Sequence, residues 1–389
     1  MDRFIKHSKI IWSQTENIFY SNEDYNQYIR QITLLHIVPN KLKKIEGSMV
    51  DEINLLCSKF EEFAKSGEPC DPIRLMKLCS FNIIFRLLFS IHYPYVMEKN
   101  SSNNVIDFIE STLGLAGQSF ASDYLHFLQP LFGRTKASRD YIESNRSIGR
   151  FLDTIIDERL KSKHDYSDPV DILDLYIIEY KANKITKNAL TYVFFDLLLA
   201  ATDTSSNTGS ALIKVVCNQP EVQEKLYQEL NTFIKKEPTL SDKNSTPYAN
   251  AVIRETLRRF PVVPLGIPHQ ATKDCYFKGY FIKEGTQIIQ NINGSMLSDE
   301  FWDDPMSFKP ERFLGESNQK NVSRVKSVFG SGTRNCLGTS LAEYELYLWT
   351  AIIFKRFKFT RLTEEKIDDS MTFGLTSMPY PFKAKVELR

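Results

Sequence analysis

Apolar residues recur every three to four positions along most of this chain, which is the spacing of one face of an α-helix. One such stretch begins near residue 40, and its apolar face consists of Leu42, Ile45, Met49, Ile53, Leu56 and Phe60. The same spacing predicts further helices over residues 73–91, 106–127, 138–161, 170–181, 186–217 and 248–260. Strand-like alternation appears only late, over 379–389 and in a hairpin over 275–290 with bends at Lys278-Gly279 and Glu284-Gly285. We therefore expect a mostly α-helical fold with a small β-rich part.

The composition points to one large globular unit. The chain has 389 residues, 42% of them hydrophobic, which is enough for a sizeable core. No internal repeat or flexible linker divides it, so residues 1–389 are expected to form a single domain. Its 49 basic residues balance 48 acidic ones, which gives no support for nucleic-acid binding. The longest apolar stretch, residues 194–201, is too short to cross a bilayer and contains Asp196. No signal peptide is visible at the N-terminus.

One cysteine stands apart from the other five because of its neighbours. The six cysteines are scattered without a C-x-x-C pair, which argues against a disulfide framework and against a zinc cluster. Cys336, however, lies in the loop Phe329-Gly-Ser-Gly-Thr-Arg-Asn-Cys-Leu-Gly338, immediately before a helical run. Gly330 and Gly332 allow this loop to curl tightly around one atom. The backbone N–H groups at the start of a helix favour a thiolate.

This loop reads F-x-x-G-x-R-x-C-x-G and resembles the haem-binding loop of the cytochrome P450 family. The resemblance extends from about Tyr25 to the C-terminus and implies the cytochrome P450 fold. It makes Cys336 the thiolate ligand of the iron of haem b, where a thiolate favours O–O cleavage. The residues of the loop that would face the cofactor are Phe329, Gly330, Arg334, Cys336 and Gly338. A buried structural cysteine before a helix is the plainer alternative.

A second motif lies inside the helix predicted over residues 186–217. There an apolar run gives way to Thr202-Asp-Thr-Ser-Ser-Asn-Thr208, seven poor helix formers whose side chains compete for backbone hydrogen bonds. The segment beginning at Ala200 is similar to the oxygen-activation motif of cytochrome P450s, although Ala201 stands where the family usually has glycine. The resemblance makes Asp203 the acid, and Thr204 the hydroxyl that opens the helix locally and positions water for proton delivery. Without the resemblance, a solvated patch on a surface helix would be the better interpretation.

A third motif pairs Glu255 with Arg258, which lie three residues apart and so share one helix face. The cytochrome P450 family buries this Glu-x-x-Arg pair and completes it with an arginine from a downstream loop. In the loop Phe308-Lys-Pro-Glu-Arg-Phe313, that arginine is Arg312. Buried charges persist only when they are paired and hydrogen-bonded. We therefore expect a structural triad that supports the Cys336 loop.

Further site residues follow from the resemblance alone. His269 ends a proline-rich segment and would hydrogen-bond a haem propionate. Arg30 would bind the propionates from an early helix, although Asn26 stands where the family has a tryptophan. The residues expected to face substrate are Val263, Leu265, Ile267, Thr376, Ser377 and the region 113–127.

The resemblance implies a haem-dependent monooxygenase that inserts one oxygen atom of O2 into a small apolar organic substrate. Electrons would come from NADPH through a flavoprotein reductase docked near the Cys336 loop. Microsomal members carry a membrane anchor and a first sheet ahead of the region matched here. We therefore expect an N-terminally shortened chain without a membrane span, placed at the endoplasmic reticulum surface by resemblance. Two alternatives stay open: an oxygen-independent haem-thiolate isomerase or dehydratase, and a truncated, non-catalytic haem-binding relative.

Overall fold

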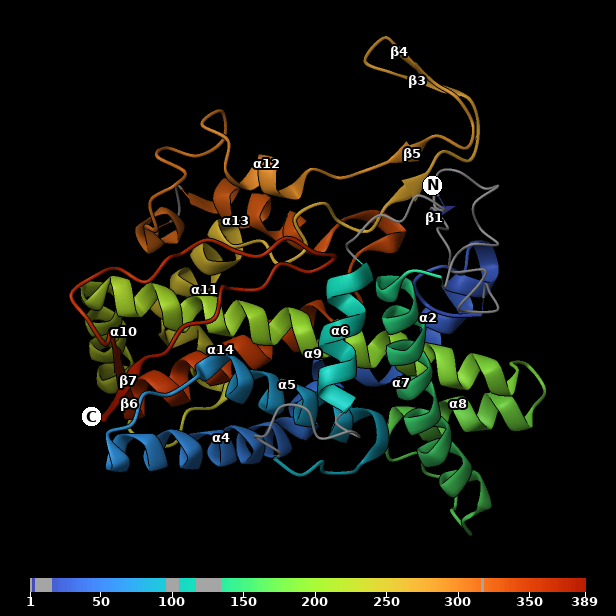
Figure 1. Cartoon of the computed structure of the whole chain (residues 1–389), viewed down its shortest axis with the longest axis horizontal. Helices are drawn as coiled ribbons and strands as arrows, with labels where there is room; N and C mark the ends of the chain where they lie inside the picture. Colours follow the sequence, from blue (N-terminus) through green and yellow to red (C-terminus); the bar gives the residue numbers. More distant parts are fainter. Residues whose placement is uncertain (1, 4–15, 96–104, 117–133, 316–317) are drawn as a thin grey trace.

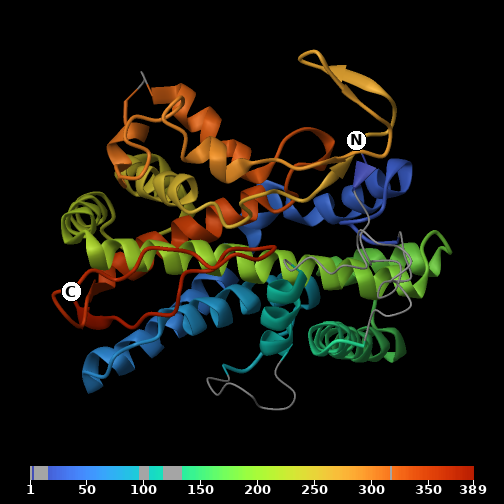
Figure 2. The ribbon, with the colours of Figure 1, turned by 45° about the horizontal axis from the view of Figure 1, so that its top comes forward.

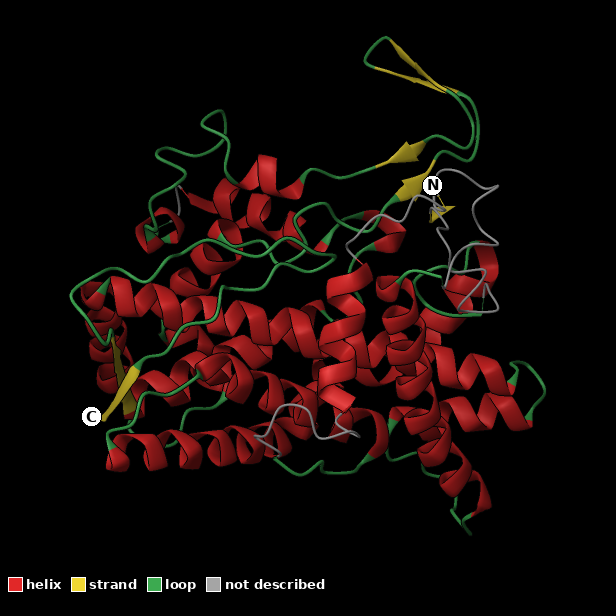
Figure 3. Cartoon of the chain, in the orientation of Figure 1, coloured by secondary structure: helices red, strands yellow, loops and turns green. Residues whose placement is uncertain are grey.

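The computed structural model describes the chain except for residues 1, 4–15, 96–104, 117–133 and 316–317. Helices dominate the described part, and the strands are short (Figures 1 and 3). The helices are α2 (Glu23–Ile37), α3 (Pro39–Leu42), α4 (Glu46–Ser66), α5 (Pro72–Phe89), α6 (Val105–Ala116), α7 (Lys136–Lys161), α8 (Ile172–Lys181), α9 (Lys187–Asn218), α10 (Pro220–Phe233), α11 (Pro247–Arg259), α12 (Ile292–Met296), α13 (Gln319–Val325) and α14 (Thr339–Arg356). The strands are β1 (Asp2–Arg3), β2 (His269–Gln270), β3 (Cys275–Phe277), β4 (Tyr280–Ile282), β5 (Gln287–Ile288), β6 (Phe357–Thr360) and β7 (Lys385–Leu388). The expected class, mostly α with a small β-rich part, is confirmed.

Helix α9 runs through the middle of the molecule, with other helices packed on several of its sides (Figure 2). Helix α5 has the most extensive contact with it, and α7, α10, α11 and α14 also touch it. Almost every residue of α5 is buried, as expected for an apolar stretch without a polar face. The apolar side chains of these helices join in one hydrophobic core.

The polar segment of α9 does not interrupt the helix. The helix is continuous from Lys187 to Asn218. Its hydroxyl groups donate to carbonyl oxygens four residues earlier: Thr204 to Ala200 (2.8 Å), Ser206 to Thr202 (2.7 Å), Thr208 to Thr204 (2.9 Å) and Ser210 to Ser206 (2.7 Å). These side chains add hydrogen bonds inside the helix and give its carbonyl groups a second partner. Most of the segment is buried, which rules out the solvated patch.

The strands form three small antiparallel sheets in the described part of the chain. Strand β2 pairs with both β1 and β5, β3 pairs with β4, and β6 pairs with β7. The predicted hairpin is confirmed over β3 and β4, where Lys278 (φ 49°) and Gly279 (φ 85°) form the tight turn, whereas residues 287–288 pair with β2. The alternation over 379–389 becomes strand only at β7, which pairs with β6 from far along the chain. In Figure 1 the β3–β4 hairpin extends away from the helical body.

Two predicted helices have different bounds in the structure. The stretch from residue 40 to residue 65 is divided into α3, a 3₁₀ turn over Lys43–Ile45, and α4. The helix predicted over 106–127 is α6 up to Ala116, and the remainder lies outside the described residues.

Candidate active site

A cavity lies between α9 and the loop that precedes α14. Its α9 wall contains Leu197, Ala200, Ala201, Thr204 and Thr208, and the loop side contributes Phe329, Gly330, Cys336, Gly338, Leu341 and Ala342. The empty space is about 1820 Å³, counting the part that is open to solvent. Most of the lining is apolar, with a few polar groups. A large, mostly apolar ligand with a few polar substituents matches such a lining.

The loop before α14 presents Cys336 to this cavity. Gly330 (φ 75°, ψ −171°) and Gly332 (φ 68°) adopt positive φ, as their place in the loop predicts. The Cys336 N–H donates to the Phe329 carbonyl oxygen (2.7 Å), and the Thr339 hydroxyl donates to the Cys336 carbonyl oxygen (3.0 Å). Both backbone ends of the cysteine are thus fixed. Of the six cysteines, Cys336 is the exposed one, and its surroundings are the cavity.

The protein around the sulfur does not by itself favour the thiolate. Although the side chain of Cys336 is open to the cavity, the protein packed around the cavity removes bulk solvent and raises the pKa of the Cys336 thiol, while the Gly338 N–H, the Thr339 hydroxyl and Arg30 lower it by less. The expected effect of the helix start is present, but the loss of solvent outweighs it. A metal ion bound to the sulfur would remove the thiol proton outright.

Two arginines and a histidine also line the cavity. Arg30 of α2 donates to the carbonyl oxygen (2.7 Å) and the side-chain oxygen (3.2 Å) of Asn335. Arg334 donates to the Ser21 carbonyl oxygen (2.6 Å) and to Asn22 Oδ1 (2.7 Å). His269, on β2, is largely buried and lines the same cavity. Cationic groups therefore stand where anionic substituents of a ligand could meet them.

This donor set fits a haem better than a bare metal ion. Among the described residues, no cluster of three or more His, Cys, Asp or Glu could hold a metal ion. A single sulfur suits an iron whose other ligands come from a macrocycle, and the arginines suit its carboxylates. A Cβ added at Gly338 would lie 3.9 Å from the Cys336 sulfur, so glycine keeps the space beside the sulfur open.

The two central residues of the polar motif point in different directions. Thr204 lines the cavity, whereas Asp203 is buried and does not belong to the described cavity wall. The Asp203 carboxylate pairs with Lys77 of α5 (Oδ1–Nζ 3.0 Å) and accepts a hydrogen bond from Asn207 (2.8 Å). Lys77 also pairs with Glu110 of α6 (3.1 Å). The acid is therefore embedded in a charge cluster that spans three helices.

Comparison with known proteins agrees with this geometry. Residues 1–386 match the family model described as "Cytochrome P450". The chain belongs to the cytochrome P450 family. It is similar to three Dictyostelium discoideum proteins, "Probable cytochrome P450 513C1" (32% identical over 96% of this chain and 77% of the relative), "Probable cytochrome P450 555A1" (34%, 98% and 80%) and "Probable cytochrome P450 513D1" (31%, 100% and 81%). The match begins ahead of Tyr25, where the resemblance was expected to start.

The membership confirms the expected fold and enzyme class. A cytochrome P450 is a monooxygenase-type oxidoreductase that carries a haem iron on a thiolate, and this chain is one. Neither comparison supports an oxygen-independent isomerase or dehydratase, or a non-catalytic relative. None of the helices in the described ranges combines the length and the apolar character that a membrane crossing requires.

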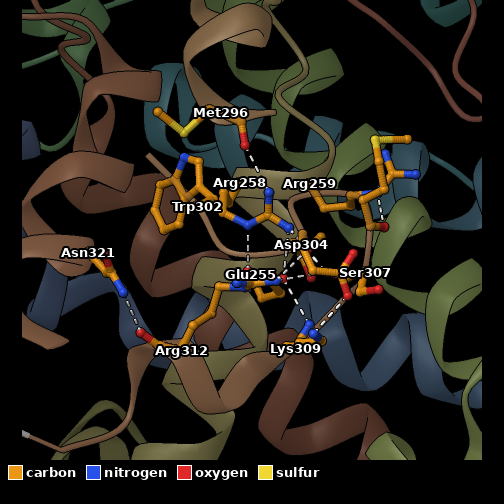
Figure 4. Close-up of polar contacts among 12 residues, drawn as sticks. Glu255, Arg258, Arg259, Met296, Trp302, Asp304, Ser307, Lys309, Arg312 and Asn321 are labelled. Atoms are coloured by element: carbon orange, nitrogen blue, oxygen red, sulfur yellow. Dashed lines mark hydrogen bonds and ion pairs between the residues drawn. The ribbon is translucent and has the colours of Figure 1, made fainter. Parts of the chain in front are cut away.

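The charged triad of this cytochrome P450 is buried and hydrogen-bonded to several groups around it (Figure 4). Glu255 accepts hydrogen bonds from Arg258 Nε (2.7 Å) and Nη2 (2.8 Å), from Arg312 Nε (3.0 Å) and from the Lys309 N–H (2.8 Å). Arg258 also donates to the Met296 carbonyl oxygen (2.8 Å). Side chains of both Glu255 and Arg258 are 0% exposed. The triad therefore ties α11 to the loop segments between α12 and α13.

The expected substrate-facing residues divide in two. Leu113, Val263, Ile267 and Thr376 line the cavity of this cytochrome P450. Leu265 does not, because Gly266 (φ 61°) turns the backbone and leaves Leu265 37% exposed. Ser377 is buried beside the wall, and its N–H donates to the Val262 carbonyl oxygen (2.7 Å). Residues 117–127 lie outside the described part.

Two buried carboxyl groups near the cavity were not predicted as site residues. Asp196 lines the cavity and accepts a hydrogen bond from the Phe19 N–H (2.9 Å). Burial raises its pKa to about 8. Glu345, on α14, has a pKa that burial also raises to about 8, and the Ser80 and Ser205 hydroxyls oppose this shift. A carboxylate inside an apolar helical run is the sequence signal that identifies Asp196, and Glu345, which directly precedes Leu346, Tyr347 and Leu348, carries the same signal.

Proposed function

We propose that this cytochrome P450 inserts one oxygen atom of O2 into a small apolar organic substrate, with Cys336 as the axial ligand of haem b. The proposal is carried by one observation: Cys336 of the loop and Thr204 of α9 line the same cavity. When bound there, the haem supplies the activation of dioxygen. The apolar remainder of the wall favours an apolar substrate.

The other loop and wall residues hold the cofactor in this proposal. Arg334, Arg30 and His269 bind its carboxylates by charge-assisted hydrogen bonds. Phe329, Gly330 and Gly338 shape the surface against which it lies. The Glu255–Arg258–Arg312 triad contributes indirectly, because it fixes the chain that supports the Cys336 loop.

Asp203 and Thr204 supply protons. A hydroxyl on the cavity wall can hold a water molecule and pass on a proton, and a neighbouring carboxyl group can replace that proton. Timed proton delivery directs reducing equivalents into product; without it they are lost as hydrogen peroxide.

Electrons come from NADPH through a flavoprotein reductase that docks near the Cys336 loop. By resemblance to microsomal members, the enzyme works at the surface of the endoplasmic reticulum membrane.

The test is an oxygen-labelling experiment with a set of apolar compounds: long-chain fatty acids, steroids and polycyclic hydrocarbons. Haem-loaded protein, NADPH and a flavoprotein reductase are incubated with each compound under ¹⁸O2. We expect one ¹⁸O atom in the product of at least one compound, and no product without reductase. Product without ¹⁸O would indicate an oxygen-independent reaction, and an absence of product from every compound would contradict the proposed substrate class.

Thr204 is tested in the same assay with the compound that is turned over fastest. Thr204→Ala should keep its haem but form less product and more peroxide per NADPH. Thr208→Ala is the matched control, since Thr208 also lines the cavity and makes the same hydrogen bond to a carbonyl four residues back. Equal coupling in wild type and Thr204→Ala would remove Thr204 from the mechanism.

A further inference from the structure

The carboxylate of Asp203 is held on both of its oxygens by groups from other parts of the fold. Oδ1 lies 3.0 Å from Lys77 Nζ. Oδ2 accepts hydrogen bonds from Asn207 Nδ2 (2.8 Å) and from the hydroxyl of Thr376, in the loop between β6 and β7. The Asp203 side chain is only 5% exposed. Its contacts therefore leave it little freedom to turn toward the cavity.

Lys77 is the group that keeps this carboxylate turned toward α5. Its side chain is 1% exposed, and it pairs with Glu110 of α6 (3.1 Å) as well as with Asp203. Burial lowers the pKa of Lys77, but Asp203 and Glu110 together raise it above the usual value, so the ammonium stays charged. Separating one member from a buried ion pair leaves an uncompensated charge and is strongly unfavourable. Asp203 is thus fixed in place by Lys77.

Thr376 is the side chain that joins this fixed acid to the cavity. Of the three described side chains that bond to the Asp203 carboxylate, Thr376 lines the cavity, whereas Lys77 and Asn207 do not. Thr204 also lines the cavity, but its hydroxyl donates to the Ala200 carbonyl oxygen. Within the described residues, Thr204 has no hydrogen bond to Asp203.

We propose that Thr376 is a proton-relay residue of this enzyme: its hydroxyl carries the proton of Asp203 to the cavity, while Lys77 positions the acid. The inference rests on the proposed function, in which Asp203 supplies protons. At rest Asp203 is a carboxylate that accepts the hydrogen bond of the Thr376 hydroxyl. In the transfer, Lys77 Nζ gives a proton to Asp203, which neutralises the pair, and the carboxyl group passes a proton to Thr376 Oγ1 as the Thr376 hydroxyl gives its own proton to a water molecule in the cavity. The hydroxyl is then unchanged, Asp203 is a carboxylate again, and Lys77 regains its proton from solvent by way of Glu110, whose side chain is 28% exposed.

The experiment compares Thr376→Val, which keeps the size of the side chain and removes the hydroxyl, with Thr376→Ser, which retains the hydroxyl. Thr372→Val is the matched control: the Thr372 hydroxyl lies in the same loop and donates to the Met378 carbonyl oxygen (3.1 Å), away from Asp203. The substrate is the compound turned over fastest in the labelling assay. Product and peroxide per NADPH are measured in H2O and in D2O.

We expect Thr376→Val to lose about fivefold in the ratio of product to peroxide, the factor that corresponds to one hydrogen bond of about 1 kcal/mol. Its solvent isotope effect should rise, because proton delivery becomes slower. Thr376→Ser should restore both values, and Thr372→Val should match the wild type. Thr376→Val with wild-type coupling and isotope effect would overturn the proposal, as would Thr372→Val with the same defect.

A second readout does not depend on turnover. In protein labelled with ¹³C at aspartate carboxyl carbons, the Asp203 signal is identified by its loss in Asp203→Asn. It should shift in haem-free Thr376→Val, return in Thr376→Ser and stay in place in Thr372→Val. An unmoved signal in Thr376→Val would contradict the contact itself.

Asp203→Asn distinguishes a failure of the proposed function of Asp203 from a failure of the inference about Thr376. If it couples normally, the role of Asp203 in the proposed function fails. If Asp203→Asn loses coupling and Thr376→Val does not, the inference about Thr376 alone fails.

Discussion

Replacing Glu255 with glutamine would test whether the buried triad stabilises the fold. Glu255 receives four hydrogen bonds, three of them from the guanidinium groups of Arg258 and Arg312. Glutamine keeps one acceptor oxygen, turns an N–H donor toward these donors, and removes the negative charge. Arg258 would then be a fully buried cation without its carboxylate.

Breaking a buried ion pair in this way costs about 3–5 kcal/mol. Unfolding entropy is about 2.1 cal/mol/K per residue, which for 389 residues is about 0.8 kcal/mol per degree. Glu255→Gln should therefore lower the melting temperature by about 4–6 °C. It should also speed the transfer of haem to an apo-globin acceptor, because the loop support is weakened.

Glu311→Gln is the matched control, in the same short segment as Arg312. Glu311 pairs with Lys225 at 2.9 Å, but both side chains are more than half exposed. An exposed pair contributes about 0–1 kcal/mol, so Glu311→Gln should melt within about 1 °C of the wild type. If Glu255→Gln melts as high as Glu311→Gln in thermal unfolding followed by circular dichroism, the reasoning about the buried triad is refuted.

Two further predictions concern the cavity. Burial raises the pKa of Asp196 from 3.8 to about 8, so its stabilising contribution is complete below pH 4 and is lost as the pH rises through 8. In Asp196→Asn the free energy of unfolding should therefore fall less steeply with pH over this range, by about 1.4 kcal/mol per pH unit. The measurement is denaturant unfolding at several pH values. If the free energy of unfolding has the same pH dependence in wild type and Asp196→Asn, this prediction is contradicted. Gly330 has φ 75° and ψ −171°, a conformation that side chains disfavour. Gly330→Ala should cost about 1–3 kcal/mol and reduce bound haem per protein, whereas Gly149→Ala, in open space on α7, should keep wild-type haem content.

Features set by short-range sequence were predictable. The Cys336 loop depends on glycines at fixed offsets, the β3–β4 turn depends on Lys278-Gly279, and Glu255 and Arg258 meet because they are one helical turn apart. The spacing of apolar residues at every third or fourth position likewise located α5, α7 and α9.

Features set by contacts between distant segments were not predictable. Nothing near Asp203 in the sequence indicates Lys77, Glu110 or Thr376, which come from α5, α6 and the loop before β7. Leu265 was wrongly expected to face substrate, because the sequence does not show that the backbone turns at Gly266 and leaves Leu265 partly exposed.

The most direct test of the account is the reduced carbon-monoxide difference spectrum of haem-loaded protein. The wild type should give the thiolate-type spectrum, and Cys336→Ala should lose it. Cys275→Ala, which changes the half-buried cysteine of β3, should keep it. A thiolate-type spectrum that survives in Cys336→Ala and disappears in Cys275→Ala would contradict the assignment of Cys336 as the haem ligand.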